Sequence, residues 1–121
     1  MLMKDSKYYW IYILECKNSK YYTGYTNDVA KRYSLHTKGK GAKYTKSFKP
    51  IKIAQCWKLH DTIAQAMKIE AFIKQKPRIF KDNLVKNPNI LKDALYKKFG
   101  VNFKIFTVNY EKIKKIAGTL P

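Results

Sequence analysis

The strongest constraint on the fold is a pair of apolar segments joined by a short polar turn near the N-terminus. Residues 8–16 are largely aromatic and β-branched, and apolar side chains occupy odd and even positions alike, which indicates a central strand covered on both faces. The stretch 17–20 supplies turn residues, and residues 21–25 again have strand composition. Together they predict a β-hairpin, with Gly24 where the backbone closely approaches another group.

A helix is predicted immediately after the hairpin, over residues 28–38. Asn27 is a suitable N-cap for it. Arg32 and His36 are four residues apart and follow its predicted apolar stripe, so their side chains should point the same way.

The following segment, residues 39–50, is predicted to be a loop that contacts nucleic acid. Lysine ammonium groups can lie along a phosphate backbone, and an aromatic ring can stack on a base. The side chains expected to do so are Lys40, Lys43, Tyr44, Lys46 and Lys49. A solvated loop without a ligand is the alternative.

A third strand and a second helix are predicted next. In residues 51–59 apolar and polar side chains alternate, which indicates one apolar face. That face would be formed by Ile51, Ile53, Gln55, Trp57 and Leu59. Asp61 or Thr62 then caps a helix that runs to about Gln75 and ends before Pro77.

Glu70 lies on an inward stripe of this second helix. A carboxylate in that position is costly unless a cation meets it. An ion pair with a lysine or with Arg32 would satisfy it, and so would a metal ion; helix periodicity alone favours the ion pair.

The last third of the chain is predicted to be mostly helical. Helices are expected at 77–85, from Asn87 or Asn89 to about Lys98, and at 109–117, while 101–108 has strand composition. The sequence contains no repeat and no linker, so we expect residues 79–121 to form an extension packed on the same domain as residues 1–78. The predicted fold class is α+β, with a three-stranded sheet flanked by helices and a mostly helical C-terminal extension.

The charge of the chain indicates an anionic partner. Lysine and arginine number 26 against 8 aspartates and glutamates, a formal net charge of +18. Nucleic acid is the best match, because each cation placed on a phosphate releases a condensed counterion. We expect no membrane partner and a cytosolic location, since neither a signal peptide nor a membrane span is visible. Cys16 and Cys56 lie in apolar segments and should be reduced core thiols.

Several of these residues, in this order, resemble the GIY-YIG nuclease domain. Trp10-Ile11-Tyr12 is similar to the first motif of that family and Tyr22-Thr23-Gly24 to the second. Arg32, His36 and Glu70 fall where the family keeps its arginine, its tyrosine or histidine, and its metal-binding glutamate. The resemblance spans roughly half of the chain. It is strongest to the small stand-alone bacterial members and more remote to the N-terminal nuclease domain of the excinuclease C subunit.

The resemblance implies a DNA endonuclease that needs Mg²⁺ or Mn²⁺ and acts on single-stranded or branched DNA. The implied catalytic residues are Tyr12, Tyr22, Arg32, His36 and Glu70, with Glu70 as the metal ligand. Either tyrosine could be the general base, and we expect the surrounding cations to favour the phenolate. Arg32 would bind phosphate oxygens in a forked geometry.

Two other classes of function stay open from the sequence. A basic nucleic-acid-binding module could keep the fold and perform no chemistry. Alternatively, a protein-interaction domain of a repair or mobile-element complex would use the C-terminal third as its contact surface. We expect a monomer in each case.

Overall fold

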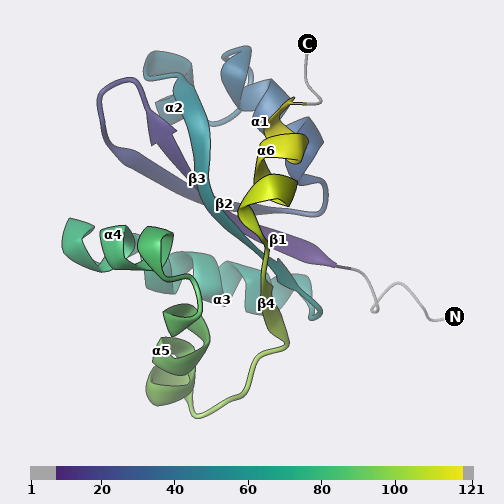
Figure 1. The fold of residues 1–121 in the computed structure, drawn as a ribbon, viewed down its shortest axis with the longest axis vertical. Helices are drawn as coiled ribbons and strands as arrows, with labels where there is room; N and C mark the ends of the chain where they lie inside the picture. The colour runs from purple at the N-terminus through teal and green to yellow at the C-terminus, as the bar shows by residue number, and fades with distance from the viewer. Residues whose placement is uncertain (1–7, 119–121) are drawn as a thin grey trace, which may run out of the picture.

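The structure is a computed structural model that describes residues 8–118 (Figure 1). An antiparallel sheet with strand order β2-β1-β3-β4 lies at its centre. The strands are β1 (Tyr9–Cys16), β2 (Tyr21–Thr26), β3 (Pro50–Leu59) and β4 (Ile105–Thr107). The helices are α1 (Val29–Thr37), α2 (Lys43–Ser47), α3 (Ile63–Lys74), α4 (Arg78–Lys86), α5 (Ile90–Phe99) and α6 (Tyr110–Gly118).

The α+β class predicted from the sequence is confirmed, with one strand more than the predicted three. Strand β4 pairs with β3, and Lys58 lies opposite Phe106 in that ladder. The added strand comes from the segment 101–108, whose composition indicated a strand. Its partner is distant in the sequence, so local patterns do not reveal that it joins the sheet.

Helices cover both faces of the sheet, so the molecule has two apolar layers. Ile11 and Ile13 of β1 face α3, α4 and α5, and the buried residues on that side form the α3-side core. Leu14 and Cys16 face α1 and α6, where a second group of buried residues forms the α1-side core. Figure 1 shows α3, α4 and α5 on one side of the sheet and α1 and α6 on the other. Strand β1 is therefore buried on both faces, as predicted.

A β-bulge in β3 corrects the predicted apolar face of the third strand. Ile13 pairs with Gln55 and Leu14 pairs with Ile53, which leaves Ala54 as an extra residue. Because one inserted residue turns the following side chains to the opposite face, Ile53 packs in the α1-side core while Trp57 packs in the α3-side core. The predicted common face of these residues is therefore wrong.

Two local predictions in the α1–α2 region also need correction. Asp28, not Asn27, caps α1, and its carboxylate accepts a hydrogen bond from the Lys31 N–H at 3.1 Å. The segment 39–50 is not all loop, because it contains the short helix α2. This helix has no capping side chain at Ala42, so the usual sequence signal for a helix start is missing.

The segment from α4 onward is tied to the sheet by hydrogen bonds as well as by packing. Gln55 Nε2 donates to the Val85 carbonyl at 3.0 Å, and the Trp57 indole N–H donates to the Pro88 carbonyl at 2.9 Å. Leu91 is fully buried in the α3-side core. These contacts make the C-terminal part an integral layer of the structure.

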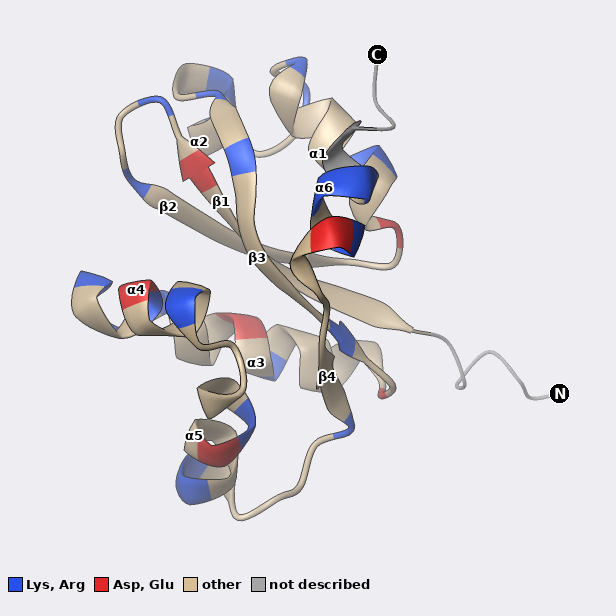
Figure 2. Ribbon diagram, viewed as in Figure 1, with Lys and Arg blue, Asp and Glu red and all other residues tan. Residues whose placement is uncertain are grey.

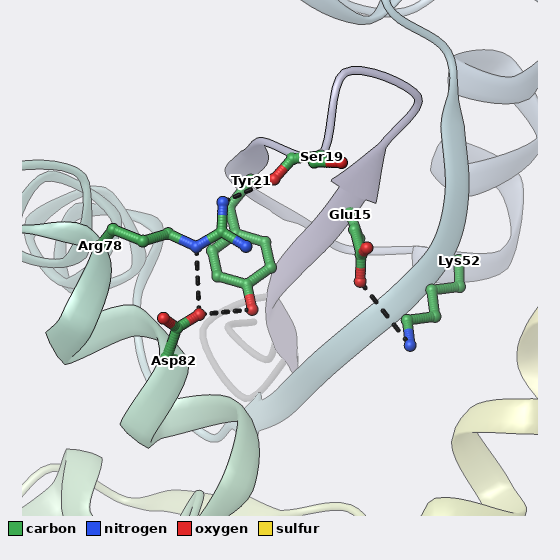
Figure 3. A network of polar contacts seen from close by, with 6 residues as sticks. All are labelled: Glu15, Ser19, Tyr21, Lys52, Arg78 and Asp82. Carbon is green, nitrogen blue, oxygen red and sulfur yellow. Dashed lines mark hydrogen bonds and ion pairs between the residues drawn. The ribbon is translucent and has the colours of Figure 1, made fainter.

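An arginine clamp joins α4 to the turn of the hairpin (Figure 3). Arg78 lies on the Tyr21 ring, 3.9 Å from its centroid, and donates to the Ser19 carbonyl at 2.6 Å. Asp82 accepts from both Arg78 Nε at 3.0 Å and the Tyr21 hydroxyl at 2.9 Å. Arg78 and Tyr21 together lower the pKa of Asp82, so this carboxylate stays charged.

Neither cysteine forms a disulfide, and both thiols are buried. Within residues 8–118, every helix is too short or too polar to span a lipid bilayer.

Candidate active site

A cleft of about 440 Å³ opens beside β2, which forms one edge of the sheet. Its lining brings together Tyr12 from β1, Tyr22 from β2, Arg32 from α1 and Glu70 from α3. These four residues come from four different elements, yet they share one concave surface. The rest of the lining comes from β1, from β2, from the residue before α1's N-cap and from the first residue of α3: Tyr9, Gly24, Tyr25, Thr26, Asn27 and Ile63.

Glycine at position 24 makes room for the Tyr12 side chain. The two residues are partners in the β1–β2 ladder. A Cβ added to Gly24 would collide with the Tyr12 hydroxyl and ring. The close approach predicted from the sequence is thus the approach of the β2 backbone to a tyrosine of the cleft.

His36 lies behind Tyr12 and takes part in a buried chain of hydrogen bonds. The Tyr12 hydroxyl is 3.0 Å from His36 Nε2, and His36 Nδ1 is 2.6 Å from Thr45 Oγ1. The Thr45 hydroxyl donates its single hydrogen to the Ala42 carbonyl at 3.0 Å, so it accepts from a protonated Nδ1. Nε2 is then the acceptor, and the Tyr12 hydroxyl donates to it.

A second glycine, Gly41, makes room for the His36 ring. A Cβ at Gly41 would collide with the His36 ring. His36 itself is 1% exposed, so it does not reach the cleft surface and contacts the cleft through Tyr12. The sequence correctly groups Arg32 and His36 on one helix face, but only Arg32 lines the cleft.

Burial dominates the acid–base properties of these groups. It lowers the pKa of His36 to about 4, assisted by the Arg32 guanidinium, so the imidazole is neutral at pH 7. Burial also raises the pKa of both cleft phenols, most strongly that of Tyr12. Lys74 and Arg32 act in the opposite direction on Tyr22 but do not outweigh burial. The nearby cations therefore favour the phenolate, as expected, but burial outweighs them and leaves both tyrosine pKa values raised.

Glu70 supplies the carboxylate of the cleft. Its side chain is 20% exposed and forms an ion pair with Lys74, with 3.5 Å between Oε2 and Nζ. The described residues 8–118 contain no group of three or more histidine, cysteine or acidic side chains placed to hold a metal ion. A lone half-buried carboxylate nevertheless suits Mg²⁺, which keeps most of its water ligands and commonly binds one or two carboxylates plus a substrate phosphate.

The lysines of the predicted nucleic-acid-binding segment lie at the surface. The exposed ones are Lys40, Lys43, Lys46 and Lys49. Tyr44 is engaged inside the protein: its ring stacks on Tyr22 with 6.1 Å between centroids, and its hydroxyl accepts from Asn18 Nδ2 at 2.8 Å. Phe48 packs against Tyr44 and keeps 42% of its surface exposed. Contacts of these residues with nucleic acid stay predictions.

Sequence reasoning missed two residues that shape the site. Thr45 is fully buried and holds His36, but a threonine in a lysine-rich segment gives no such signal before the fold is known. Lys74 was not singled out, because the sequence indicated only an unspecified lysine as a partner of Glu70. Its ammonium group lies 5.6 Å from the Tyr22 ring centroid and also pairs with Glu70, and the i, i+4 spacing to Glu70 was the available signal.

Comparisons with known proteins identify the family of this chain. The family model of the GIY-YIG catalytic domain matches residues 8–83. A UPF0213 protein of Fusobacterium nucleatum is 38% identical over 109 residues, covering 89% of this chain and 97% of that protein. A UPF0213 protein of Cupriavidus necator is 48% identical over 71 residues, covering 59% of this chain and 75% of that protein.

A solution NMR structure of a UPF0213 protein from Bacillus halodurans is also similar. It is 40% identical, with 65% of this chain and 83% of that chain covered and a TM-score of 0.43. The matched family model extends from the start of β1 into α4 and includes all four cleft residues. The chain therefore belongs to the GIY-YIG family of nuclease domains.

Proposed function

We propose that this protein is a metal-dependent DNA endonuclease that hydrolyses phosphodiester bonds in the cleft. The observation that carries the proposal is the convergence of Tyr12, Tyr22, Arg32 and Glu70 on one concave surface of about 440 Å³. Hydrolysis of a phosphodiester needs an activated water, cationic groups near the phosphoryl oxygens and stabilisation of the leaving oxygen. The four side chains have the chemistry for these tasks.

Tyr22 is the proposed general base. It is less buried than Tyr12, and both Lys74 and Arg32 favour its charged form. Tyr12 has its proton directed to His36, so the lone pairs of its oxygen are free to accept a hydrogen bond from the attacking water. In this arrangement Tyr12 orients the water, and Tyr22 removes its proton.

Arg32 is the proposed phosphate ligand. It lines the cleft from α1, and a guanidinium can donate two parallel hydrogen bonds to phosphate oxygens. Its permanent charge also opposes the charge that develops on these oxygens during attack. A lysine could not provide the same forked geometry.

Glu70 is the proposed ligand of a single hydrated Mg²⁺ or Mn²⁺. When bound, such an ion would polarise the phosphate and stabilise the leaving oxygen. Lys74, already paired with Glu70, would have to share this carboxylate with the ion. GIY-YIG nucleases generally depend on divalent metals, which supports the assignment.

The proposed substrate is single-stranded or branched DNA. A net charge of +18 favours a polyanion, and Figure 2 shows basic segments spread over the helices while acidic segments are few. Cytosolic location and a monomeric state stay predictions, as does the division of the chain at residue 78.

The test is cleavage of labelled DNA with Mg²⁺ or Mn²⁺ by the wild type and by two variants. Arg32→Ala and Glu70→Ala should each lose cleavage. Lys31→Ala, on the same helix as Arg32, and Glu15→Ala, a glutamate paired with Lys52, are matched controls that should cleave normally. Unchanged cleavage by Arg32→Ala or Glu70→Ala would refute the proposed roles.

The Glu70–Lys74 ion pair favours one alternative, a nucleic-acid-binding module without chemistry. Under this alternative Glu70 has only an electrostatic role. DNA binding would then be independent of metal and sensitive to salt, and Glu70→Ala would leave binding unchanged or tighten it, because one negative charge is removed. Cleavage that requires both metal and Glu70 excludes this alternative.

A further inference from the structure

A row of three side chains crosses the sheet at the end opposite the hairpin turn. Trp10 of β1 pairs with Lys58 of β3, and Lys58 pairs with Phe106 of β4. Residues directly opposite one another in a sheet project from the same face. The three strands thus present an aromatic ring, an ammonium group and a second aromatic ring side by side.

A second pair of rings extends this row. Tyr8 and His60 have ring centroids 3.9 Å apart, and His60 and Phe106 have centroids 5.1 Å apart. Tyr8 is 43% exposed and Phe106 is 50% exposed. We call this surface the aromatic platform; it consists of Tyr8, Trp10, Lys58, His60, Phe106 and Lys112.

The platform borders a shallow groove of about 290 Å³ between the sheet and the start of α6. Lys58 Nζ lies 4.0 Å from the Tyr8 ring centroid, and Lys112 Nζ lies 5.9 Å from the Trp10 ring centroid. Among the residues that the structure describes, no acidic side chain lines this groove. Aromatic faces and positive charge therefore occur together in a groove whose lining, within residues 8–118, contains no carboxylate.

This combination matches the chemistry of an unpaired nucleic-acid strand. Exposed bases stack on aromatic rings that project from a sheet surface, while neighbouring lysines bind the phosphates between them. Duplex DNA offers phosphates but keeps its bases stacked internally, so it cannot use the rings. We propose that the aromatic platform is a second nucleic-acid-binding site, specific for single strands.

The platform is separate from the cleft. The groove and the cleft share no lining residue, and the adjacent residues Tyr9 and Trp10 line one each. Strand β1 carries residues of both sites, because Trp10 lines the groove while Tyr9 and Tyr12 line the cleft. The proposal concerns binding alone and holds whether or not the cleft performs chemistry.

Tryptophan fluorescence gives a local readout of this site. The chain has two tryptophans: Trp10 is on the platform, whereas Trp57 is only 1% exposed in the core. Titration of the full chain with a short oligothymidylate, in EDTA to prevent cleavage, should quench the Trp10 emission. Phe106→Ala should weaken this binding at least about fivefold, since stacking of a base on an aromatic ring contributes that much or more.

Matched variants separate the platform from general effects. Tyr96→Ala removes another exposed aromatic residue, on α5, and should bind as the wild type does. Lys112→Gln should weaken binding, whereas Lys97→Gln on α5 should not. Unfolding curves of each variant verify that the fold is kept.

Two results would overturn the proposal. One is equal affinity of Phe106→Ala, Lys112→Gln and Tyr96→Ala for the oligothymidylate. The other is quenching of Trp10 by vesicles of anionic lipid but not by the oligothymidylate, which would assign the platform to a membrane surface. Because EDTA abolishes any cleavage, neither result depends on the proposed function of the cleft.

Discussion

Tyr12 and Tyr22 line the same cleft but differ in how firmly they hold their protons. Burial raises both pKa values, and the effect is larger for Tyr12, whose proton is also directed to His36. If Tyr22 is the base, its phenolate fraction rises about tenfold per pH unit above neutrality. This difference leads to an ordered prediction for the two phenylalanine variants.

Tyr22→Phe should lower kcat by about 10²–10⁴-fold, the usual contribution of a general base, and Tyr12→Phe should lower it less. Wild-type cleavage should also accelerate from pH 7 to pH 9, with that acceleration lost in Tyr22→Phe. Both are measured from initial rates on labelled single-stranded DNA. A variant Tyr22→Phe that keeps the wild-type rate and pH profile would assign the base elsewhere.

Thr45 does not line the cleft, yet its hydroxyl fixes the tautomer of His36. Thr45→Val keeps the shape but removes the acceptor of Nδ1–H, so a buried donor is left unsatisfied at a cost of about 1–3 kcal/mol of stability. It also frees His36 to donate from Nε2 and disturbs Tyr12. Urea unfolding should detect the loss, and cleavage rates should fall.

Thr45→Ser is the matched control, because it restores the hydroxyl. It should recover most of the stability and the cleavage rate. NMR spectra of the imidazole nitrogens would report the tautomer directly, and an unchanged tautomer in Thr45→Val would contradict this role.

The depressed pKa of His36 predicts that stability falls with acidity. The unfolded chain protonates this imidazole near pH 6.5, but the folded protein does so only near pH 4. The unfolded state therefore binds more protons between these values, and the free energy of unfolding should decrease as the pH falls from 6.5 to 4, by about 3 kcal/mol in total. Urea titrations at successive pH values measure it. An equal decrease in His36→Gln would show that another group is responsible.

At the level of elements, local sequence patterns predicted those features whose causes are local. The hairpin follows from two apolar runs around a polar turn. The N-cap of α3 is Thr62, whose hydroxyl accepts from the Gln65 N–H. Gly100 ends α5 in the left-handed conformation that favours glycine. These signals lie within a few residues of the feature that they specify.

Features set by distant contacts were not predictable in the same way. The bulge at Ala54 depends on the register between β1 and β3, and the uncapped helix α2 contacts His36 of α1 through Thr45. The convergence of Tyr12 and Glu70 followed only from the resemblance to a known family, because no local pattern relates a strand residue to a helix so far along the chain. The geometry in the structure supplies that relation.

The C-terminal layer should be required for folding. Leu91, Leu95 and Phe103 are buried in the same core as Ile11 and Ile13 of β1. Each such side chain contributes about 2 kcal/mol by burial, so losing three approaches the total stability of an ordinary domain, about 5–15 kcal/mol. A chain that ends at Asn87 should lack a cooperative thermal transition in circular dichroism.

Point variants on α5 provide the matched comparison. Leu95→Ala should destabilise the full chain by about 2–5 kcal/mol, whereas Tyr96→Ala, at the neighbouring exposed position, should have little effect. A chain ending at Asn87 that unfolds as cooperatively as the full chain would contradict the integral role of this layer.

On the scale of the whole molecule, the excess of basic residues is compatible with the two apolar cores because the charged groups lie outside them. Charge and fold thus have separate roles. The net charge of +18 attracts a polyanion over the entire surface, whereas the sheet edge and the helices α1 and α3 determine where chemistry can occur. Under the proposed function, a neutral surface with the same cleft would bind DNA weakly, and the same surface without the cleft would bind DNA and not cleave it.

The central claim is that Glu70 holds a divalent ion in the cleft that Tyr12, Tyr22 and Arg32 also line. Anomalous scattering from a crystal soaked with Mn²⁺ tests this claim most directly. The account predicts a peak within about 2–2.6 Å of a Glu70 carboxylate oxygen, on the side facing the two phenols, that is absent in Glu70→Gln. Manganese bound elsewhere, with no peak at Glu70, would contradict it.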